Sequence, residues 1–106
     1  MSWLLLALAG ILEVVWAYAL KESHGFSRFW PSVIAIVGII ASLGLLAVAM
    51  RSLPLSLAYM IWTGIGAVGS FIVGAWLLGE GVSLLRMSAA AMIVGGLLLL
   101  KLSHSA

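Results

Sequence analysis

Glu13 is the residue of this sequence whose type and position most strongly indicate chemistry. It interrupts an apolar run, residues 2–20, in which every other side chain is uncharged. A carboxylate near the middle of a bilayer costs about 2.5–3.5 kcal/mol on insertion scales. A group that exchanges protons or binds a cation accounts for this cost. The alternative is a protonated acid that makes one hydrogen bond between helices.

The neighbours of Glu13 on a helix favour a functional role. Residues three and four positions away share its face, and these are Ala9, Gly10, Trp16 and Ala17. The small residues leave room for another helix or for a ligand. Trp16 offers an aromatic face that can bound a cation, although a tryptophan in a membrane helix more often serves packing.

A second group of polar side chains lies in two later apolar runs. Tyr59 and Trp62 are three residues apart, so they share a helical face, and Thr63 follows them. Each of the two rings combines an apolar body with one hydrogen-bond donor. Ser42, in the preceding run, has a hydroxyl that can bond a carboxylate or its own backbone.

Glycines follow this group at positions 64, 66 and 69. Such a cluster weakens a helix and permits a bend. The same residues also allow ordinary close packing between helices. The sequence leaves these two interpretations about equally favoured.

The elements that position these residues follow from composition. The chain is 65% hydrophobic and 8% charged, whereas soluble domains are about one-quarter charged. A bilayer core takes roughly 20 helical residues to cross, and the strict alternation of a membrane barrel is absent. We therefore predict an all-α membrane protein, a single domain over residues 1–106, with transmembrane helices at about 2–20, 32–50, 55–78 and 84–102.

The connections carry most of the charges and set the topology. Gly25 and Pro31 mark the first connection as a loop. One side of the membrane receives Arg51 and Lys101, and the other receives three basic residues, Lys21, Arg28 and Arg86. The positive-inside rule barely chooses between orientations on this difference. The chain either takes one topology or inserts both ways.

Several classes of protein are disfavoured. The chain has no cysteine, and its two histidines, His24 and His104, fall at loop or terminal positions, so we expect no metal site and no cofactor. Five scattered basic residues make no nucleic-acid patch. No nucleophile–base pair indicates an enzyme. The apolar beginning lacks the basic region and cleavage site of a signal peptide.

A single acid on four helices cannot both enclose a site and open it to either side. A second copy would supply a second Glu13 and enclose the space between the two. Transporters commonly place a midplane site between two halves of inverted orientation. A homodimer of oppositely inserted copies would have that symmetry, and the weak charge bias is consistent with it.

Two segments resemble the small multidrug resistance family over essentially the full chain. They are AGILEVVWAYALKESHGFSRFWPS, residues 9–32, and LPLSLAYMIWTGIGAVG, residues 53–69. Glu13 followed by Trp16, with the LK-x-S-x-GF-S-R pattern beyond, is similar to the guanidinium-exporter subtype. The quaternary-ammonium subtype shares the AY-x-IW pattern but has different flanks around its acid.

The resemblance implies a proton-coupled exporter of guanidinium and small guanidinyl cations in the bacterial inner membrane. It implies an antiparallel, dual-topology homodimer in which protons and substrate compete for the paired Glu13 carboxylates. By the same resemblance Ser42 and Trp62 would hydrogen-bond and orient that carboxylate, and Trp16 and Tyr59 would line the pocket. Gly10 would leave room beside the acid. Thr63 and Lys101 are supporting residues.

Three positions depart from the family pattern. Leu57 and Met60 replace the Thr and Ala common in the family, and because they flank Tyr59 we expect them to alter pocket width or polarity. Leu99 replaces a common glycine, which puts a close helix contact in doubt there. None of the three lies in the Glu13 group.

Competition between protons and cation follows from elementary electrostatics. Guanidinium is planar, stays charged and offers only donors, like the head of arginine, and a carboxylate accepts two parallel N–H bonds from it.

Two alternative functions of the chain remain open. One is an exporter of quaternary ammonium drugs with the same fold, and the other is a non-transporting accessory subunit of a membrane complex.

Overall fold

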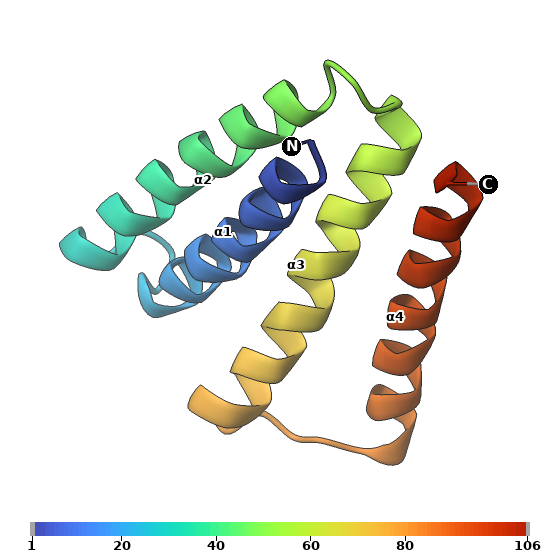
Figure 1. The fold of residues 1–106 in the computed structure, drawn as a ribbon. Coiled ribbons are helices and arrows are strands. Elements are labelled where there is room, and N and C mark those ends of the chain that lie inside the picture. The colour runs from blue at the N-terminus through green and yellow to red at the C-terminus, as the bar shows by residue number, and fades with distance from the viewer. Residues whose placement is uncertain (1, 106) are drawn as a thin grey trace.

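The chain folds into four helices joined by short connections (Figure 1). The structure, a computed structural model, describes the backbone of residues 2–105 and the side chains up to residue 103. The helices are α1 (Ser2–Glu22), α2 (Phe29–Ala49), α3 (Leu55–Leu77) and α4 (Leu84–Ser105). By length and composition, each is able to cross a membrane. The predicted all-α architecture of four such helices is confirmed.

The start of α2 differs from the prediction. The helix begins at Phe29, after the extended residue Arg28, rather than near residue 32. Pro31 was expected in the loop but lies in the first helical turn. A proline is tolerated there because the first N–H groups of a helix have no partner within it.

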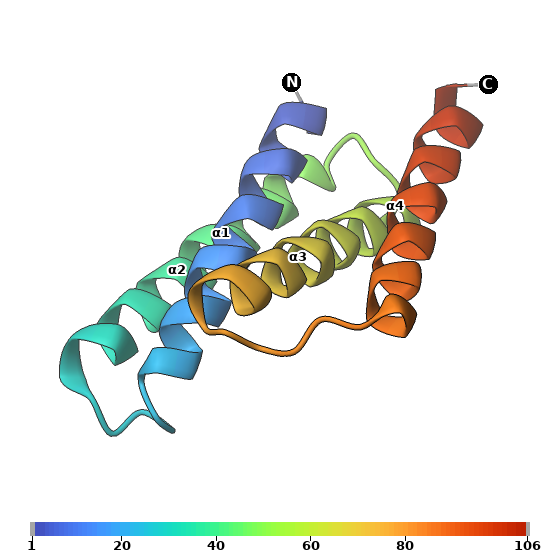
Figure 2. The ribbon, with the colours of Figure 1, turned by 90° about the horizontal axis from the view of Figure 1, so that it is seen from below.

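The helices pack unequally. α1 lies between α2 and α3 and contacts both, while α2 and α3 touch little. The backbone of α4 packs only along α3, and both views show it standing apart from α1 and α2 (Figures 1 and 2), although the Lys101 side chain reaches the Trp3 ring of α1. The first three helices therefore form the body of the molecule, with α4 attached along one side.

Large buried side chains gather at one end of this body. We call it the core end, because it holds the start of α1, the turn between α2 and α3, and the start of α3. The core consists of Leu6, Ala9, Leu46, Ala49, Leu53, Leu57, Ala58, Ile61 and Trp62. At this end the Ser2 and Ser52 hydroxyls are also hydrogen-bonded to each other.

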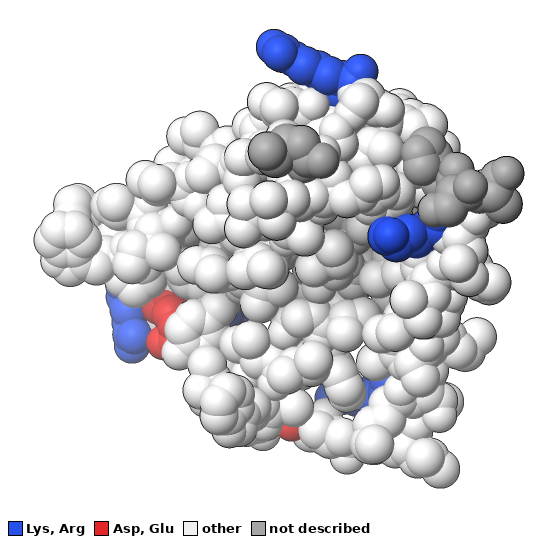
Figure 3. Space-filling view, viewed as in Figure 1, with Lys and Arg blue, Asp and Glu red and all other residues white. Residues whose placement is uncertain are grey.

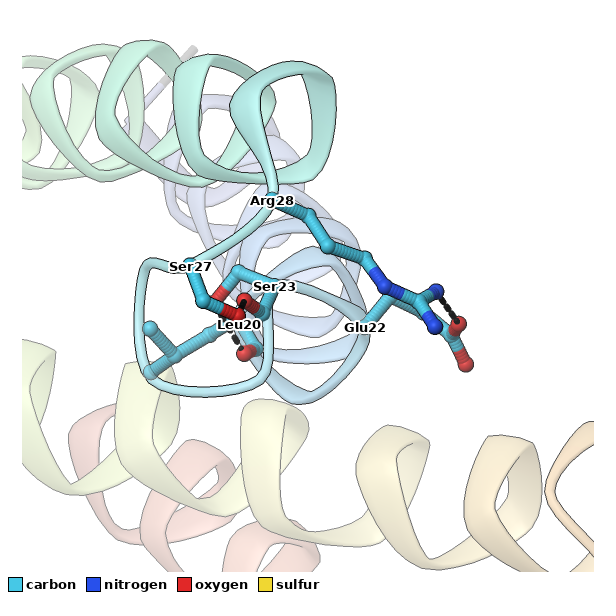
Figure 4. Close-up of polar contacts among 5 residues, drawn as sticks. All are labelled: Leu20, Glu22, Ser23, Ser27 and Arg28. Atoms are coloured by element: carbon cyan, nitrogen blue, oxygen red, sulfur yellow. Dashed lines mark hydrogen bonds and ion pairs between the residues drawn. The ribbon is translucent and has the colours of Figure 1, made fainter.

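The opposite end, which we call the loop end, carries the connections α1–α2 (residues 23–28) and α3–α4 (residues 78–83). The first is organised by the fully buried Ser23 (Figure 4). Its hydroxyl donates to the Leu20 carbonyl at 2.7 Å and accepts from the Phe26 N–H at 3.1 Å. Phe26 has a positive φ of 67°, a conformation uncommon for a bulky residue, and these bonds hold it in place.

The second connection begins with a glycine that terminates α3. Gly79 follows the last α3 residues with φ of 66°, the left-handed conformation that commonly ends helices. The next backbone N–H, that of Glu80, donates to the Gly74 carbonyl at 2.9 Å. The chain therefore turns back toward α3 before it enters α4.

Candidate functional site

Glu13 lies on the face of α1 that meets α3. Its carboxylate sits directly against the backbone of Gly66, where a Cβ atom would collide with it. The Oε1 atom is buried, and among the described residues it has no hydrogen-bond partner. Buried polar atoms in proteins are nearly always paired, so an unpaired one needs an explanation. An acid oxygen of this kind is prepared to accept a donor from outside the chain, or to hold a proton.

Ser42 and Trp62 form a buried network beside this acid. The indole N–H of Trp62 donates to Ser42 Oγ at 3.0 Å, and the Ser42 hydroxyl donates to the Ala9 carbonyl at 2.7 Å. This arrangement corrects the expectation that both side chains bond the Glu13 carboxylate. Ala9 lies four residues before Glu13, so its carbonyl is the normal helical acceptor for the Glu13 N–H. The network therefore ties α2 and α3 to the turn that carries the acid.

Trp16 faces α2 rather than α3. Its Cβ lies 2.7 Å from the position that a side chain at Gly38 would occupy, so the glycine allows the two helices to approach. The Trp16 Nε1 atom is buried and, like Glu13 Oε1, has no hydrogen-bond partner within the described residues. One turn of α1 thus carries an unpaired donor and an unpaired acceptor.

Tyr59 and Thr63 lie away from Glu13, at the boundary between α3 and α4. Together with Met60 they line a cavity of about 290 Å³ there. Tyr59 is 52% exposed, and its ring centroid lies 5.5 Å from that of Trp62. Through this ring contact Tyr59 touches the Ser42–Trp62 network, but within one chain it does not reach the acid.

Gly10 and Lys101 lie against other residues than Glu13. A Cβ at Gly10 would meet Ile65 at 2.6 Å, so the glycine makes room for α3 rather than for a ligand beside the acid. The Lys101 Nζ lies 5.2 Å from the centre of the Trp3 ring. Trp3 is ten residues before Glu13, or about 15 Å along a helix. Lys101 therefore acts at the core end, where it joins α4 to α1.

The glycines of α3 are contact positions in an uninterrupted helix. Gly66 receives Glu13, Gly69 receives Val14, and Gly64 accommodates Leu97 of α4. The sequence had left a bend and close packing about equally favoured, and the structure shows close packing. Gly66 is the site residue that sequence reasoning did not single out. Its place among closely spaced glycines was the available signal.

The family departures fall in different environments. Leu57 is 6% exposed and belongs to the core, so its larger side chain fills the body rather than a pocket. Met60 does line the α3–α4 cavity beside Tyr59. Leu99 is 68% exposed on α4.

Charged atoms lie toward the two ends of the molecule and leave the face between them uncharged (Figure 3). This pattern suits helices that cross an apolar layer, and Glu13 is the exception within it. In the part of the chain that the structure describes, no three His, Asp or Glu side chains come together as a metal site would require. The site is thus an acid, a tryptophan and a glycine cleft, supported by a hydroxyl–indole network.

Comparison with known proteins places this chain among transporters. The family model described as Small Multidrug Resistance protein matches residues 1–102. A guanidinium exporter of Escherichia coli O6:H1 is 57% identical, with 97% of this chain and 98% of that protein covered. Guanidinium exporters of Yersinia pseudotuberculosis and Salmonella typhimurium are each 54% identical, covering 97% of this chain and 99% and 98% of theirs. These names describe transporters rather than enzymes.

Proposed function

Because the chain belongs to the small multidrug resistance family, we propose that it exports guanidinium and small guanidinyl cations in exchange for protons. The resemblance drawn from its two motifs is confirmed. The observation that carries the proposal is the Glu13 carboxylate, whose buried Oε1 atom has no hydrogen-bond partner in the described part of the chain. A guanidinium ion supplies both the charge and the N–H donors that such a group lacks.

Exchange follows from the two ways of satisfying one carboxylate. A proton neutralises it and turns one oxygen into a donor, whereas a bound guanidinium neutralises it by charge and hydrogen bonds. The two ligands exclude each other, so loading one releases the other. An empty, ionised site is unfavourable away from water, which opposes the change of access when nothing is bound.

The proposed transporter is a homodimer of two oppositely inserted copies in the bacterial inner membrane. Three features of the chain support this assembly. The α4 helix has no buried residue among its described side chains. The loop end carries three basic residues, Lys21, Arg28 and Arg86, against Arg51 and Lys101 at the core end. One chain also contributes only one membrane-embedded acid, and a pair of acids allows two protons to exchange for one cation.

In this assembly the neighbours of Glu13 have separate roles. The Ser42–Trp62 network holds the α1 turn that carries Glu13 in position relative to α2 and α3, because Ser42 is bonded to the Ala9 carbonyl of that turn. Trp16, one helical turn beyond the acid, has a buried indole N–H without a hydrogen-bond partner among the described residues. Tyr59 and Met60 lie at an exposed position on α3, where a second copy can bring them to the shared pocket.

The test is guanidinium flux in proteoliposomes under an imposed pH gradient. The wild-type protein is expected to move guanidinium in the direction opposite to the proton flow. This should hold whether the imposed gradient drives protons into or out of the vesicles. Glu13→Gln keeps the shape of the side chain but cannot release a proton or carry charge, so flux should fall to background. Glu22→Gln is the matched control, since Glu22 lies on the same helix, is paired with Arg28 and is outside the site.

Three outcomes would contradict the proposal. Proton-coupled guanidinium flux by Glu13→Gln at the wild-type rate would remove the acid from the mechanism. Flux of tetrapropylammonium with none of guanidinium would instead assign the chain to quaternary ammonium export. A purified wild-type protein that transports neither cation would favour an accessory role.

A further inference from the structure

A cavity of about 130 Å³ lies between the last turns of α1 and α3, at the loop end. Its polar lining residues come from three segments, and they are Tyr18, Lys21, Ser70 and Glu80. Val14, the residue after Glu13, lines its inner side. Lys21 is eight residues beyond Glu13, or about 12 Å along the helix. The cavity therefore extends from the turn next to the proposed exchange site to a charged rim at the membrane edge.

The rim acid, Glu80, is held inward by its backbone. Its N–H donates to the Gly74 carbonyl at 2.9 Å, and its carboxylate lies against Gly74, where a Cβ atom would collide with it. Because Gly74 leaves this space, the side chain folds back along α3 and lines the cavity, while Glu80 as a whole remains exposed at the rim.

Glu80 also differs from Glu22, the other acid of the loop end, in its charge partners. Among the described residues Arg28 and Glu22 form the one ion pair, with Nη1 and Oε2 separated by 3.9 Å (Figure 4). Arg86 is the basic residue nearest to Glu80 in sequence. Its guanidinium group donates a hydrogen bond to the Gly81 carbonyl at 2.7 Å. The Glu80 carboxylate thus faces the cavity with its charge not used in an ion pair.

We propose that Glu80 is an outer docking site, at which a small planar cation is bound before it reaches Glu13. The inference rests on the proposed function and adds a second acidic station to it. A guanidinium ion in the cavity would meet the Glu80 carboxylate and the Tyr18 and Ser70 hydroxyl oxygens, all of which accept N–H bonds. Lys21 lines the same cavity, and its like charge weakens the binding, so the cation is not retained at the rim.

The proposal is tested by guanidinium uptake kinetics in proteoliposomes of neutral lipid. Removing a charge from a binding route lowers the capture rate more than the later steps. Glu80→Gln is therefore expected to raise KM for guanidinium about threefold at low salt, with kcat unchanged. The difference should vanish near 1 M salt, where the screening length is only about 3 Å. Glu80→Asp keeps the charge and should restore most of the wild-type KM.

Two further variants make the test decisive. Glu22→Gln removes an equal charge from the same end of the molecule, but from an ion pair outside the cavity, and should leave KM unchanged. Lys21→Gln should shift KM in the opposite direction, to a lower value. Equal kinetics of Glu80→Gln, Glu22→Gln and wild type would overturn the docking site while leaving the exporter intact. Absence of wild-type flux would instead count against the proposed function itself.

Discussion

The core end and the loop end of the same three helices are built on different principles. At the core end, large side chains such as Leu6, Leu46 and Leu53 are buried, and hydroxyl and indole groups pair with each other. At the loop end the buried residues are small, for example Ala19 and Ala35. There α1 and α3 leave a cavity with charged side chains on its rim.

The difference teaches where this molecule can be rigid and where it can open. Close packing at the core end resists displacement, because each buried contact is lost when helices separate. Helices that meet through small residues and a cavity lose less when they part. Glu13 lies between these two ends, with the packed Ser42–Trp62 network on one side and, on the other, a cavity whose rim carries charged side chains. An exchange site needs such a boundary, since its ligand must be both oriented and admitted.

The largest effect is expected from filling the space at Gly66 that the Glu13 carboxylate occupies, because this tests directly whether the acid must lie between the two ends. In Gly66→Ala the new Cβ would collide with the carboxylate, and the flexible side chain can yield without unfolding the protein. The displaced acid should lower guanidinium kcat/KM at least about tenfold, because small misplacements of reacting groups are costly. The measurement is flux together with thermal stability.

Gly44→Ala is the control for this variant. A Cβ at Gly44 of α2 would meet nothing within 4 Å, so flux and stability should both stay close to wild type. Equal flux in the two variants would show that the Gly66 cleft does not set the position of the acid.

A second prediction concerns the packed side of the boundary. Ser42→Ala and Trp62→Phe each remove one partner of the buried 3.0 Å hydrogen bond. In a double-mutant cycle we expect a coupling energy of about 0.6 kcal/mol, the average that such cycles give for hydrogen bonds between membrane helices. Reversible unfolding in mixed micelles measures it. A coupling indistinguishable from zero would mean that the bond does not hold α2 and α3 together.

The smallest expected effect lies at the outer margin of the core end. Lys101→Met and Trp3→Leu should show a coupling of about 0.5 kcal/mol, the low end of the range for a cation over an aromatic ring. The same micelle unfolding assay applies, with Arg51→Met as the control for loss of charge at that end. If the control lowers stability as much as Lys101→Met does, the contact with Trp3 is not the cause.

The sequence predicted the helices better than it predicted their neighbours. Apolar runs of about 20 residues dictate spans in a membrane protein, so four helices followed from composition alone. The helical position of Pro31 was missed, and α1 and α4 end two and three residues later than expected. An acid in an apolar run pointed to Glu13 for a similar reason. The partners of Ser42 and the residue accommodated by Gly10 depend on helix rotation and tilt, which neither charge nor hydropathy determines. Gly66 and Glu80 required the fold, because their importance comes from what lies opposite.

The isolation of α4 has a consequence for how this sequence can change over time. None of its described side chains is buried, and its backbone packs only along α3. Substitutions in the other helices are constrained by the folding of the individual chain. On α4, substitutions mainly change the contacts that the chain makes with lipid or with other protein chains. They can therefore change its binding partners over evolution while the body formed by α1, α2 and α3 stays intact.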